Sequence, residues 1–221
     1  MIDHTRHSGI FDASKTEVTL VGAGGIGAVT AVTLAKMGIG KLTVYDDDVV
    51  DKVNIATQFH KISDIGKVKA WAVCDAVSAY ADTFCSGYGI RIDKNWIFDD
   101  KDIYISTVDS IASRQEIWQA LLDSNMYDQW HSFYVDARMG AEVFEMFVVR
   151  MGEHEWYEHH LMSSSDNDFP DLPCTSKATI YTANIAAGHI GAAVRRIITN
   201  QQEPGLLTHH IFHNKLSFLS M

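Results

Sequence analysis

Cysteine and proline are both scarce in this sequence, with three of each among 221 residues. The cysteines, Cys74, Cys85 and Cys174, are odd in number and form no CxxC pair, so we expect neither a disulfide framework nor a cysteine-bound zinc ion. Such a chain fits a reducing, cytoplasmic setting. No apolar run approaches the roughly 18 residues of a membrane span, and the first residues lack a signal-peptide core. We therefore expect no association with a membrane.

Positive charge is also in short supply, because 18 Lys and Arg residues stand against 28 Asp and Glu residues, for a net charge of -10. A protein this acidic repels phosphate backbones, and we expect no nucleic-acid partner. A polyphosphate ligand would have to be held locally, by a helix N-terminus, a few basic side chains or a metal ion. The chain length and an ordinary apolar content of 47% predict a single domain over residues 1–221.

What the chain does contain is an alternation of strand and helix patterns. The apolar run Glu17–Val21 predicts a strand, which leads through a glycine turn into a helix over residues 25–37. This alternation is typical of an α/β fold, and we predict a Rossmann-like, doubly wound sheet whose N-terminal part is parallel. Further strands are predicted at residues 41–45, 90–92, 103–107 and 132–136, and further helices at residues 66–80 and 110–123.

Beyond about residue 140 the pattern changes. Residues 141–150 alternate apolar and polar side chains, which predicts an antiparallel C-terminal extension of the sheet with one solvated face. Residues 151–173 are the least structured stretch, and we predict a crossover-type loop there; loops of this length are usually functional or disordered. A long helix over residues 178–199 and a hairpin around residues 213 and 214 complete the prediction.

The turn after the first strand has the pattern GxGxxG, formed by Gly22, Gly24 and Gly27, with Gly25 inside it. The first glycine allows a tight turn, the second lets the backbone approach a phosphate, and the third permits close packing of the helix on the strand. The following helix offers free N–H groups and the positive end of its dipole. Asp46 ends the second strand, where a carboxylate can accept hydrogen bonds from ribose hydroxyls. These features predict a nucleotide site and leave NAD and ATP both open.

The blocks that follow the second strand favour ATP. They read DDDVVDKVNIATQF, then DIGKVKA, then STVDS with Arg114 behind it. Together they resemble the ThiF/MoeB/ubiquitin-activating family, whose members carry two acidic residues, an asparagine, a glutamine before an apolar residue and an IGxxK segment in this order. The resemblance extends from about residue 6 to residue 196. The matching positions are Asp46, Asp48, Asn54, Gln58 and Lys69.

The resemblance implies an enzyme that uses ATP and Mg²⁺ to adenylate a carboxylate, most simply the C-terminal glycine of a ubiquitin-like or sulfur-carrier protein. It assigns the phosphates to Lys69 and Mg²⁺ to Asp109, and it makes Asn54 and Gln58 neutral donors to phosphate or ribose oxygens. It also implies a homodimer in which Arg6 reaches the ATP of the partner subunit. From the residues alone, Lys69 is equally a solvated helix lysine, Asp109 a helix N-cap, and the two amides loop packing.

Thr57 departs from the family pattern. The family usually has an arginine immediately before the glutamine, and that arginine also touches the phosphates. Loss of a charged donor costs a few kcal/mol of transition-state stabilisation in comparable sites. Either another cation replaces it, with Lys61, Lys67 and Arg114 as the candidates, or the activity is altered.

Cys174 lies in the segment LPCTSKA, just before the predicted long helix. It resembles the family cysteine that precedes the same helix. A thiol at a helix N-terminus, near Lys177, favours the thiolate, which is able to accept an activated acyl group from an adenylate. A partly buried, inert cysteine is the alternative.

Three other functions remain open. A catalytically weak, nucleotide-binding partner subunit is favoured by Thr57. Adenylation of a peptide or of a modified tRNA would use the same fold, although the net charge argues against tRNA. An NAD-dependent oxidoreductase is disfavoured by the series formed by Asn54, Gln58, Lys69 and Asp109.

Overall fold

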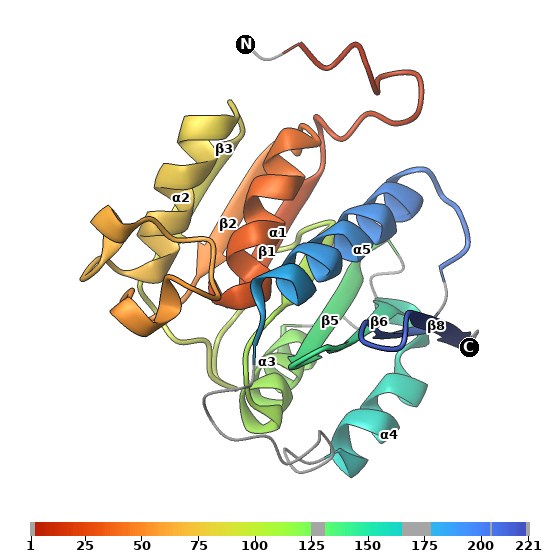
Figure 1. Ribbon diagram of the computed structural model, residues 1–221. Helices are drawn as coiled ribbons and strands as arrows, with labels where there is room; N and C mark the ends of the chain where they lie inside the picture. The colour runs from red at the N-terminus through yellow and green to blue at the C-terminus, as the bar shows by residue number, and fades with distance from the viewer. Residues whose placement is uncertain (1–2, 125–130, 165–177, 204, 220–221) are drawn as a thin grey trace.

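The computed structural model describes residues 3–124, 131–164, 178–203 and 205–219. Within this part of the chain, eight strands form one mixed sheet (Figure 1). The strands are β1 (Glu17–Val21), β2 (Lys41–Tyr45), β3 (Phe84–Tyr88), β4 (Ile103–Ser106), β5 (Phe133–Gly140), β6 (Val143–Arg150), β7 (Leu206–His210) and β8 (Lys215–Leu219). Their order across the sheet is β3-β2-β1-β4-β5-β6-β7-β8.

The first five strands pair in parallel, as the alternation of patterns predicts. The chain runs outward from β1 to β2 and β3, and then crosses to the other side of β1 to form β4 and β5. The strand order therefore reverses between β1 and β4. In open α/β sheets, ligands bind beyond the carboxyl ends of the strands at such a reversal. The predicted Rossmann-like, doubly wound fold is confirmed, and it places the candidate site at this point.

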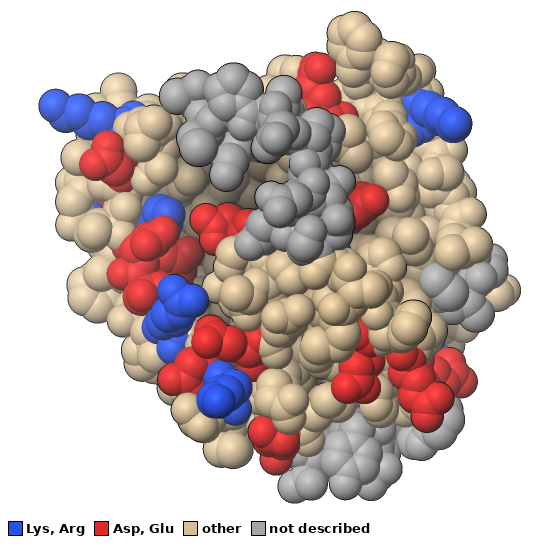
Figure 2. All heavy atoms as spheres, turned by 90° about the horizontal axis from the view of Figure 1, so that it is seen from below, with Lys and Arg blue, Asp and Glu red and all other residues tan. Residues whose placement is uncertain are grey.

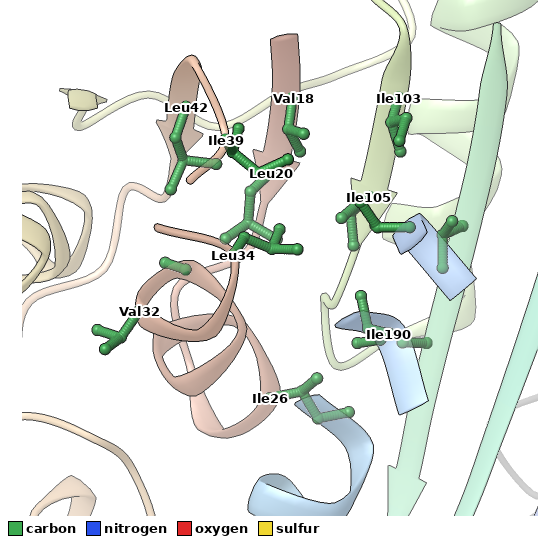
Figure 3. Packing of buried hydrophobic residues seen from close by; sticks show 14 of the residues in the cluster. Val18, Leu20, Ile26, Val32, Leu34, Ile39, Leu42, Ile103, Ile105 and Ile190 are labelled. Atoms are coloured by element: carbon green, nitrogen blue, oxygen red, sulfur yellow. The ribbon is translucent and has the colours of Figure 1, made fainter. Parts of the chain in front are cut away.

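Helices cover both faces of the sheet (Figure 1). They are α1 (Gly25–Lys36), α2 (Lys69–Tyr80), α3 (Ile111–Asp123), α4 (Glu155–Ser163) and α5 (Ile180–Ile198). On one face α1 packs against α2 and α5, and the apolar side chains of α1, α5 and the central strands form the main core (Figure 3). On the other face α3 and α4 enclose a second core rich in aromatic side chains.

The antiparallel extension is confirmed, because β6, β7 and β8 pair antiparallel in succession after β5. The predicted loop over residues 151–173 is wrong in its first part, where a 3₁₀ helix, η4 (Met151–Glu153), and then α4 occur. The helix forms because Tyr157 and Leu161, four residues apart, are both fully buried in the second core. Residues 165–173 of the predicted loop, and Cys174 after it, lie outside the described residues.

The third strand is another correction. It lies at β3 and not at the predicted residues 90–92. Its sequence, FCSGY, is polar and contains a glycine, so it does not have the apolar pattern typical of a buried strand. β3 is the edge of the sheet, and its residues are only partly buried, so it does not need a continuous apolar run. α2 begins at Lys69 and not at residue 66, since Gly66 adopts a positive φ of 90°.

A disulfide joins Cys74 of α2 to Cys85 of β3, with the two Cα atoms 5.4 Å apart. The expectation that the cysteines form no disulfide is therefore wrong. Sequence spacing does not reveal the pair, because it depends on α2 packing back onto the edge strand that follows it. Among the described residues, no helix has the length and apolar character needed to cross a bilayer.

Candidate functional site

The glycine turn lies between the carboxyl ends of β1 and β4. Gly22 has a φ of +98°, and a Cβ on it would stand 2.9 Å from the backbone of Thr107. A Cβ on Gly27 would stand 2.0 Å from the Gly22 carbonyl oxygen. The Thr107 hydroxyl donates to that carbonyl at 2.8 Å. Only glycine fits at these two positions, so the GxGxxG pattern is a steric requirement of this turn.

The N-terminus of α1 is left open to a ligand by this turn. Gly24 is the N-cap residue, and it has no side chain with which to cap the first N–H groups of the helix. Among the described residues the Gly24 N–H has no hydrogen-bond partner. Free N–H groups and the positive end of the helix dipole therefore face the switch point, where they suit an anion.

Asp46 holds the turn from the end of β2. Its carboxylate accepts hydrogen bonds from the Ala23 N–H at 2.7 Å and from the Asp48 N–H at 2.9 Å. Burial raises the pKa of Asp46, against the lowering effects of the Ala23 N–H and of the nearby Lys69 charge. Asp46 thus ties the glycine turn to the acidic segment that follows β2.

Lys69 begins α2 and lies within electrostatic range of Asp46. Its ammonium contacts a carboxylate oxygen of Asp48 at 2.7 Å, and its N–H donates to the Asp48 carbonyl oxygen at 2.8 Å. The Lys69 side chain is 9% exposed, whereas that of Asp48 is 69% exposed. The lysine is therefore held in place by the protein, while its carboxylate partner is free to exchange with solvent or a ligand.

Three consecutive carboxylates mark the surface beside Lys69. One oxygen from each of Asp46, Asp47 and Asp48 lies within 4.8 Å of the others, close enough to share a cation. Figure 2 views this end of the molecule and shows acidic side chains gathered on it with fewer basic ones between them. An anionic ligand here needs Lys69, the helix N-terminus or a metal ion to offset this charge.

The segment between β2 and α2 brings Gln58 to the glycine turn. Gln58 Nε2 lies 3.9 Å from the position that a Cβ on Gly24 would occupy. Asn54 is used locally instead: its side chain accepts from the Asp51 N–H at 2.9 Å in a capping box around η1 (Lys52–Asn54). Gln58 therefore lies beside the glycine turn, whereas Asn54 Oδ1 stabilises the loop in which it lies.

Asp109 lies on the loop between β4 and α3, two residues beyond Thr107, which touches the glycine turn. It is exposed, and among the described residues its carboxylate has no hydrogen-bond or ion-pair partner. It is not the N-cap of α3, because Ser110 accepts from the Ser113 N–H at 3.1 Å in that role. This leaves the Asp109 carboxylate available to a ligand or a metal ion at the switch point.

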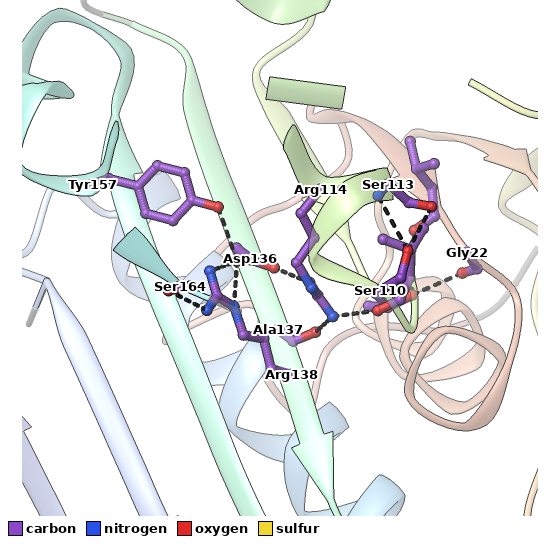
Figure 4. Close-up of polar contacts among 12 residues, drawn as sticks. Gly22, Ser110, Ser113, Arg114, Asp136, Ala137, Arg138, Tyr157 and Ser164 are labelled. Carbon is purple, nitrogen blue, oxygen red and sulfur yellow. Dashed lines mark hydrogen bonds and ion pairs between the residues drawn. The ribbon is translucent and has the colours of Figure 1, made fainter. Parts of the chain in front are cut away.

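A buried charge network lies behind the Asp109 loop (Figure 4). Asp136 of β5 has no exposed surface and pairs with both Arg114 and Arg138, the latter at 2.8 Å. The Tyr157 hydroxyl donates to the same carboxylate at 2.9 Å. Arg114 also donates to the carbonyl oxygens of Val108 and Ala137. The network therefore fixes the loop that follows β4.

This network does not follow from the predicted strand over residues 132–136, because that strand ends at Asp136 and leaves its carboxylate at the exposed end of the strand. β5 continues to Gly140, so Tyr134, Asp136 and Arg138 alternate onto one buried face. A signal was present in the DAR spacing, which puts opposite charges two residues apart on the same side of a strand.

The three cations considered as replacements for the arginine missing at position 57 differ in whether they already form ion pairs. Arg114 is buried in the network just described, and Lys67 pairs with Asp64 and Asp75, each at 3.2 Å. Lys61 is exposed and makes no ion pair within the described part of the chain. Two of the three candidates are thus already occupied.

Arg6 lies at the opposite end of α1 from the glycine turn. The ring of the neighbouring His4 lies about 3.1 Å from the position of a Cβ on Gly38, just beyond the C-terminus of α1. The 12 residues of α1 separate the two ends by about 18 Å at a rise of ~1.5 Å per residue. Arg6 therefore does not join the site of its own chain, and its reach into a partner subunit stays a prediction.

Comparisons with known proteins agree on one family. The model of the ThiF family matches residues 2–221. The chain is 30% identical over 125 residues to the "probable adenylyltransferase/sulfurtransferase MoeZ" of Mycobacterium tuberculosis, covering 54% of this chain and 32% of that protein. It is 33% identical over 105 residues to the SAMP-activating enzyme E1 of Haloferax volcanii, covering 45% and 39%. These matches thus span about a third of the length of the curated relatives.

Solved structures support the fold. The crystal structure of E. coli MccB with ATP superposes with a TM-score of 0.73 at 20% identity, over 95% of this chain and 64% of that chain. The structure of PaaA superposes with a TM-score of 0.71 at 18% identity, over 93% and 72%. Identities this low establish the shared architecture alone.

Proposed function

The chain belongs to the ThiF family, and we propose that it catalyses the ATP-dependent adenylation of a carboxylate. The proposed substrate is the C-terminal glycine of a ubiquitin-like or sulfur-carrier protein. One observation carries the proposal: the open N-terminus of α1, Lys69 and Asp109 all lie around the carboxyl ends of β1, β2 and β4. Such a site has the cationic and metal-binding groups that a triphosphate requires and that a dinucleotide does not.

The chemistry follows from this arrangement. A carboxylate oxygen of the substrate attacks the α-phosphorus of ATP, the new P–O bond forms, and the bond to pyrophosphate breaks. The N–H groups of Gly24 and the first turn of α1 bind phosphate oxygens, and Lys69 leaves Asp48 to bind them as well. Mg²⁺ at Asp109 would neutralise charge on the leaving pyrophosphate. Asp46 orients the ribose, and Gln58 donates to an oxygen beside Gly24.

The side chain of Asp109 is chemically suited to bind a magnesium ion. Its carboxylate is a hard oxygen ligand, it is exposed, and the α3 N-cap role falls to Ser110. A separate group of carboxylate oxygens, from Asp46, Asp47 and Asp48, follows β2, with its members within 4.8 Å of one another. Because the Asp109 carboxylate has no partner among the described residues, a bound ion or ligand best explains its role.

A second step and a partner subunit complete the proposal. Cys174 accepts the acyl group from the adenylate, as a thiolate attacking the acyl carbon while AMP leaves with the bonding electrons. Arg6 contributes to the site of a second copy in a homodimer, which agrees with its distance from its own glycine turn.

One alternative has a specific observation in its favour. Thr57 lacks a cationic side chain, and two of the three neighbouring cations already have carboxylate partners. A subunit that binds ATP and turns it over slowly within an activating complex agrees with this. A peptide carboxylate is the alternative substrate for an active enzyme.

The test is ATP–pyrophosphate exchange in the presence of candidate carrier proteins and Mg²⁺. We expect wild-type exchange to fall on the order of 10²-fold or more in Asp109→Asn, with ATP binding measured in parallel. Cys174→Ala is the companion variant, and it should retain exchange while losing the covalent carrier adduct. ATP binding without exchange for any carrier or peptide would favour the inactive subunit, and tight binding of NAD in place of ATP would refute both.

A further inference from the structure

His60 reaches the glycine turn from the segment between β2 and α2. It is 8% exposed, and its Nε2 lies 3.1 Å from the carbonyl oxygen of Ala23. A carbonyl oxygen only accepts hydrogen bonds, so Nε2 carries the proton and donates it. On its other side, Ala23 donates its N–H to Asp46 at 2.7 Å. The residue before Gly24 is therefore clamped at both of its backbone polar groups.

The direction of the Ala23 carbonyl fixes the direction of the next N–H. The structure has no cis peptide bond among the described residues, so the Ala23–Gly24 peptide is trans. In a trans peptide the C=O and the following N–H point to opposite sides. With the carbonyl turned to His60, the Gly24 N–H points away from His60, and it has no partner among the described residues. Gly24 has no Cβ to resist rotation, so an external contact has to hold this peptide in place.

The imidazole is buried as a neutral ring. Its Nδ1 atom is buried and has no hydrogen-bond partner within the described residues. Burial lowers the pKa of His60, and the charge of Lys69 acts in the same direction. A neutral ring with one donor suits a neighbour of a phosphate site that already holds a lysine, because it orients the backbone without adding another charge.

We propose that His60 is a positioning residue for nucleotide binding, which turns the Ala23–Gly24 peptide so that the Gly24 N–H faces a phosphate oxygen. The inference rests on the proposed binding of ATP at the glycine turn. His60 itself touches no phosphate. Its contribution passes through one hydrogen bond to one peptide group, so it acts on nucleotide affinity and not on the rate of the chemical step.

The test compares three substitutions at His60 by their dissociation constants for ATP and Mg²⁺. Glutamine places a donor near the position of Nε2, whereas asparagine is too short and leucine has no donor. We expect His60→Leu and His60→Asn to weaken ATP binding by about 5- to 10-fold, the worth of one hydrogen bond, and His60→Gln to recover most of it. In exchange assays the KM for ATP should rise with little change in kcat. His131→Leu is the matched control, because the His131 side chain is 61% exposed and pairs with Asp100, away from the glycine turn.

A local readout separates positioning from general stability. ATP should protect the Gly24 amide from exchange in the wild type and protect it less in His60→Asn, while exchange in the centre of β4 stays the same in both proteins. If the wild type binds ATP and all three variants bind it equally well, the inference is wrong while the proposed function stands. If the wild type does not bind ATP at all, the proposed function itself fails.

Discussion

Two groups of polar and charged side chains, one after β2 and one behind the loop that follows β4, differ in their access to water. The first, here called the open cluster, consists of Asp46, Asp48 and Lys69, and one of its carboxylates is 69% exposed. The second, the buried network, consists of Arg114, Asp136, Arg138 and Tyr157, none of them more than 5% exposed. The same residue types thus remain open to solvent in one place and are locked into the fold in the other.

The physical difference lies in the cost of separating the charges. Lys69 is able to leave Asp48 because water solvates the released carboxylate. Arg114 and Arg138 have no such option, because removing Asp136 would leave two guanidinium groups buried without a counter-charge. An exchangeable ion pair suits a binding site, and a permanent one suits a scaffold that holds the loop after β4.

The largest expected effect comes from the same substitution made in both groups. Asp136→Asn should lower the free energy of unfolding by about 3–5 kcal/mol, because it uncouples two buried cations. Asp48→Asn should cost at most about 1 kcal/mol, because its pair is half in water. Urea unfolding of both variants measures the difference. Equal losses would mean that the two groups are not distinct in the way their exposure suggests.

The second largest effect is on activity, where a substitution in the open cluster should matter more than one in the buried network. Lys69→Gln should reduce ATP–pyrophosphate exchange by about 10²- to 10³-fold while the free energy of unfolding changes by only ~1 kcal/mol. Tyr157→Phe, which removes one hydrogen bond to Asp136, should cost ~1 kcal/mol of stability with exchange nearly unchanged. A Lys69 variant that exchanges normally would remove the lysine from the proposed site.

The smallest expected effect is on the pH dependence of the free energy of unfolding, to which a histidine beside the open cluster contributes. Burial lowers the pKa of His60, beside the open cluster, and that of His189 in α5, both below the ordinary value of 6.5. These two histidines then bind protons more readily in the unfolded chain than in the folded chain. Their contribution to the free energy of unfolding is therefore fully present above pH 6.5 and is lost as the pH falls below it. In the buried network, burial works to lower the pKa of Arg138, but the charge of Asp136 outweighs it and raises the pKa, so this guanidinium stays charged throughout the range.

Unfolding free energies measured between pH 7 and pH 5 test this sign. The acid-side decline should become shallower in His60→Gln and in His189→Gln. The same substitution at the exposed His131 should leave the slope as it is. Equal slopes in the wild type, in the two histidine variants and in the His131 variant would contradict the lowered pKa values of His60 and His189.

Much of the site could be predicted because its residues lie in short blocks of sequence. The glycine turn and Asp46 lie at strand ends, where local pattern places them, and the expectation for Lys69 comes from the family resemblance. Asp136 and His60 could not be predicted in this way. The role of Asp136 depends on how far β5 continues, and that of His60 depends on a contact across 37 positions of the chain.

The sequence by itself determined the α/β alternation, the antiparallel extension, the glycine turn and the types of charged residue around it, because these depend on periodicity and on steric limits within a few residues. Only the tertiary structure decided which charges are buried and which are exchangeable. It also revealed the helix within residues 151–164, the edge strand Phe84–Tyr88 and the Cys74–Cys85 disulfide. Burial and pairing depend on contacts between segments far apart in the chain, which periodicity over a few residues does not determine.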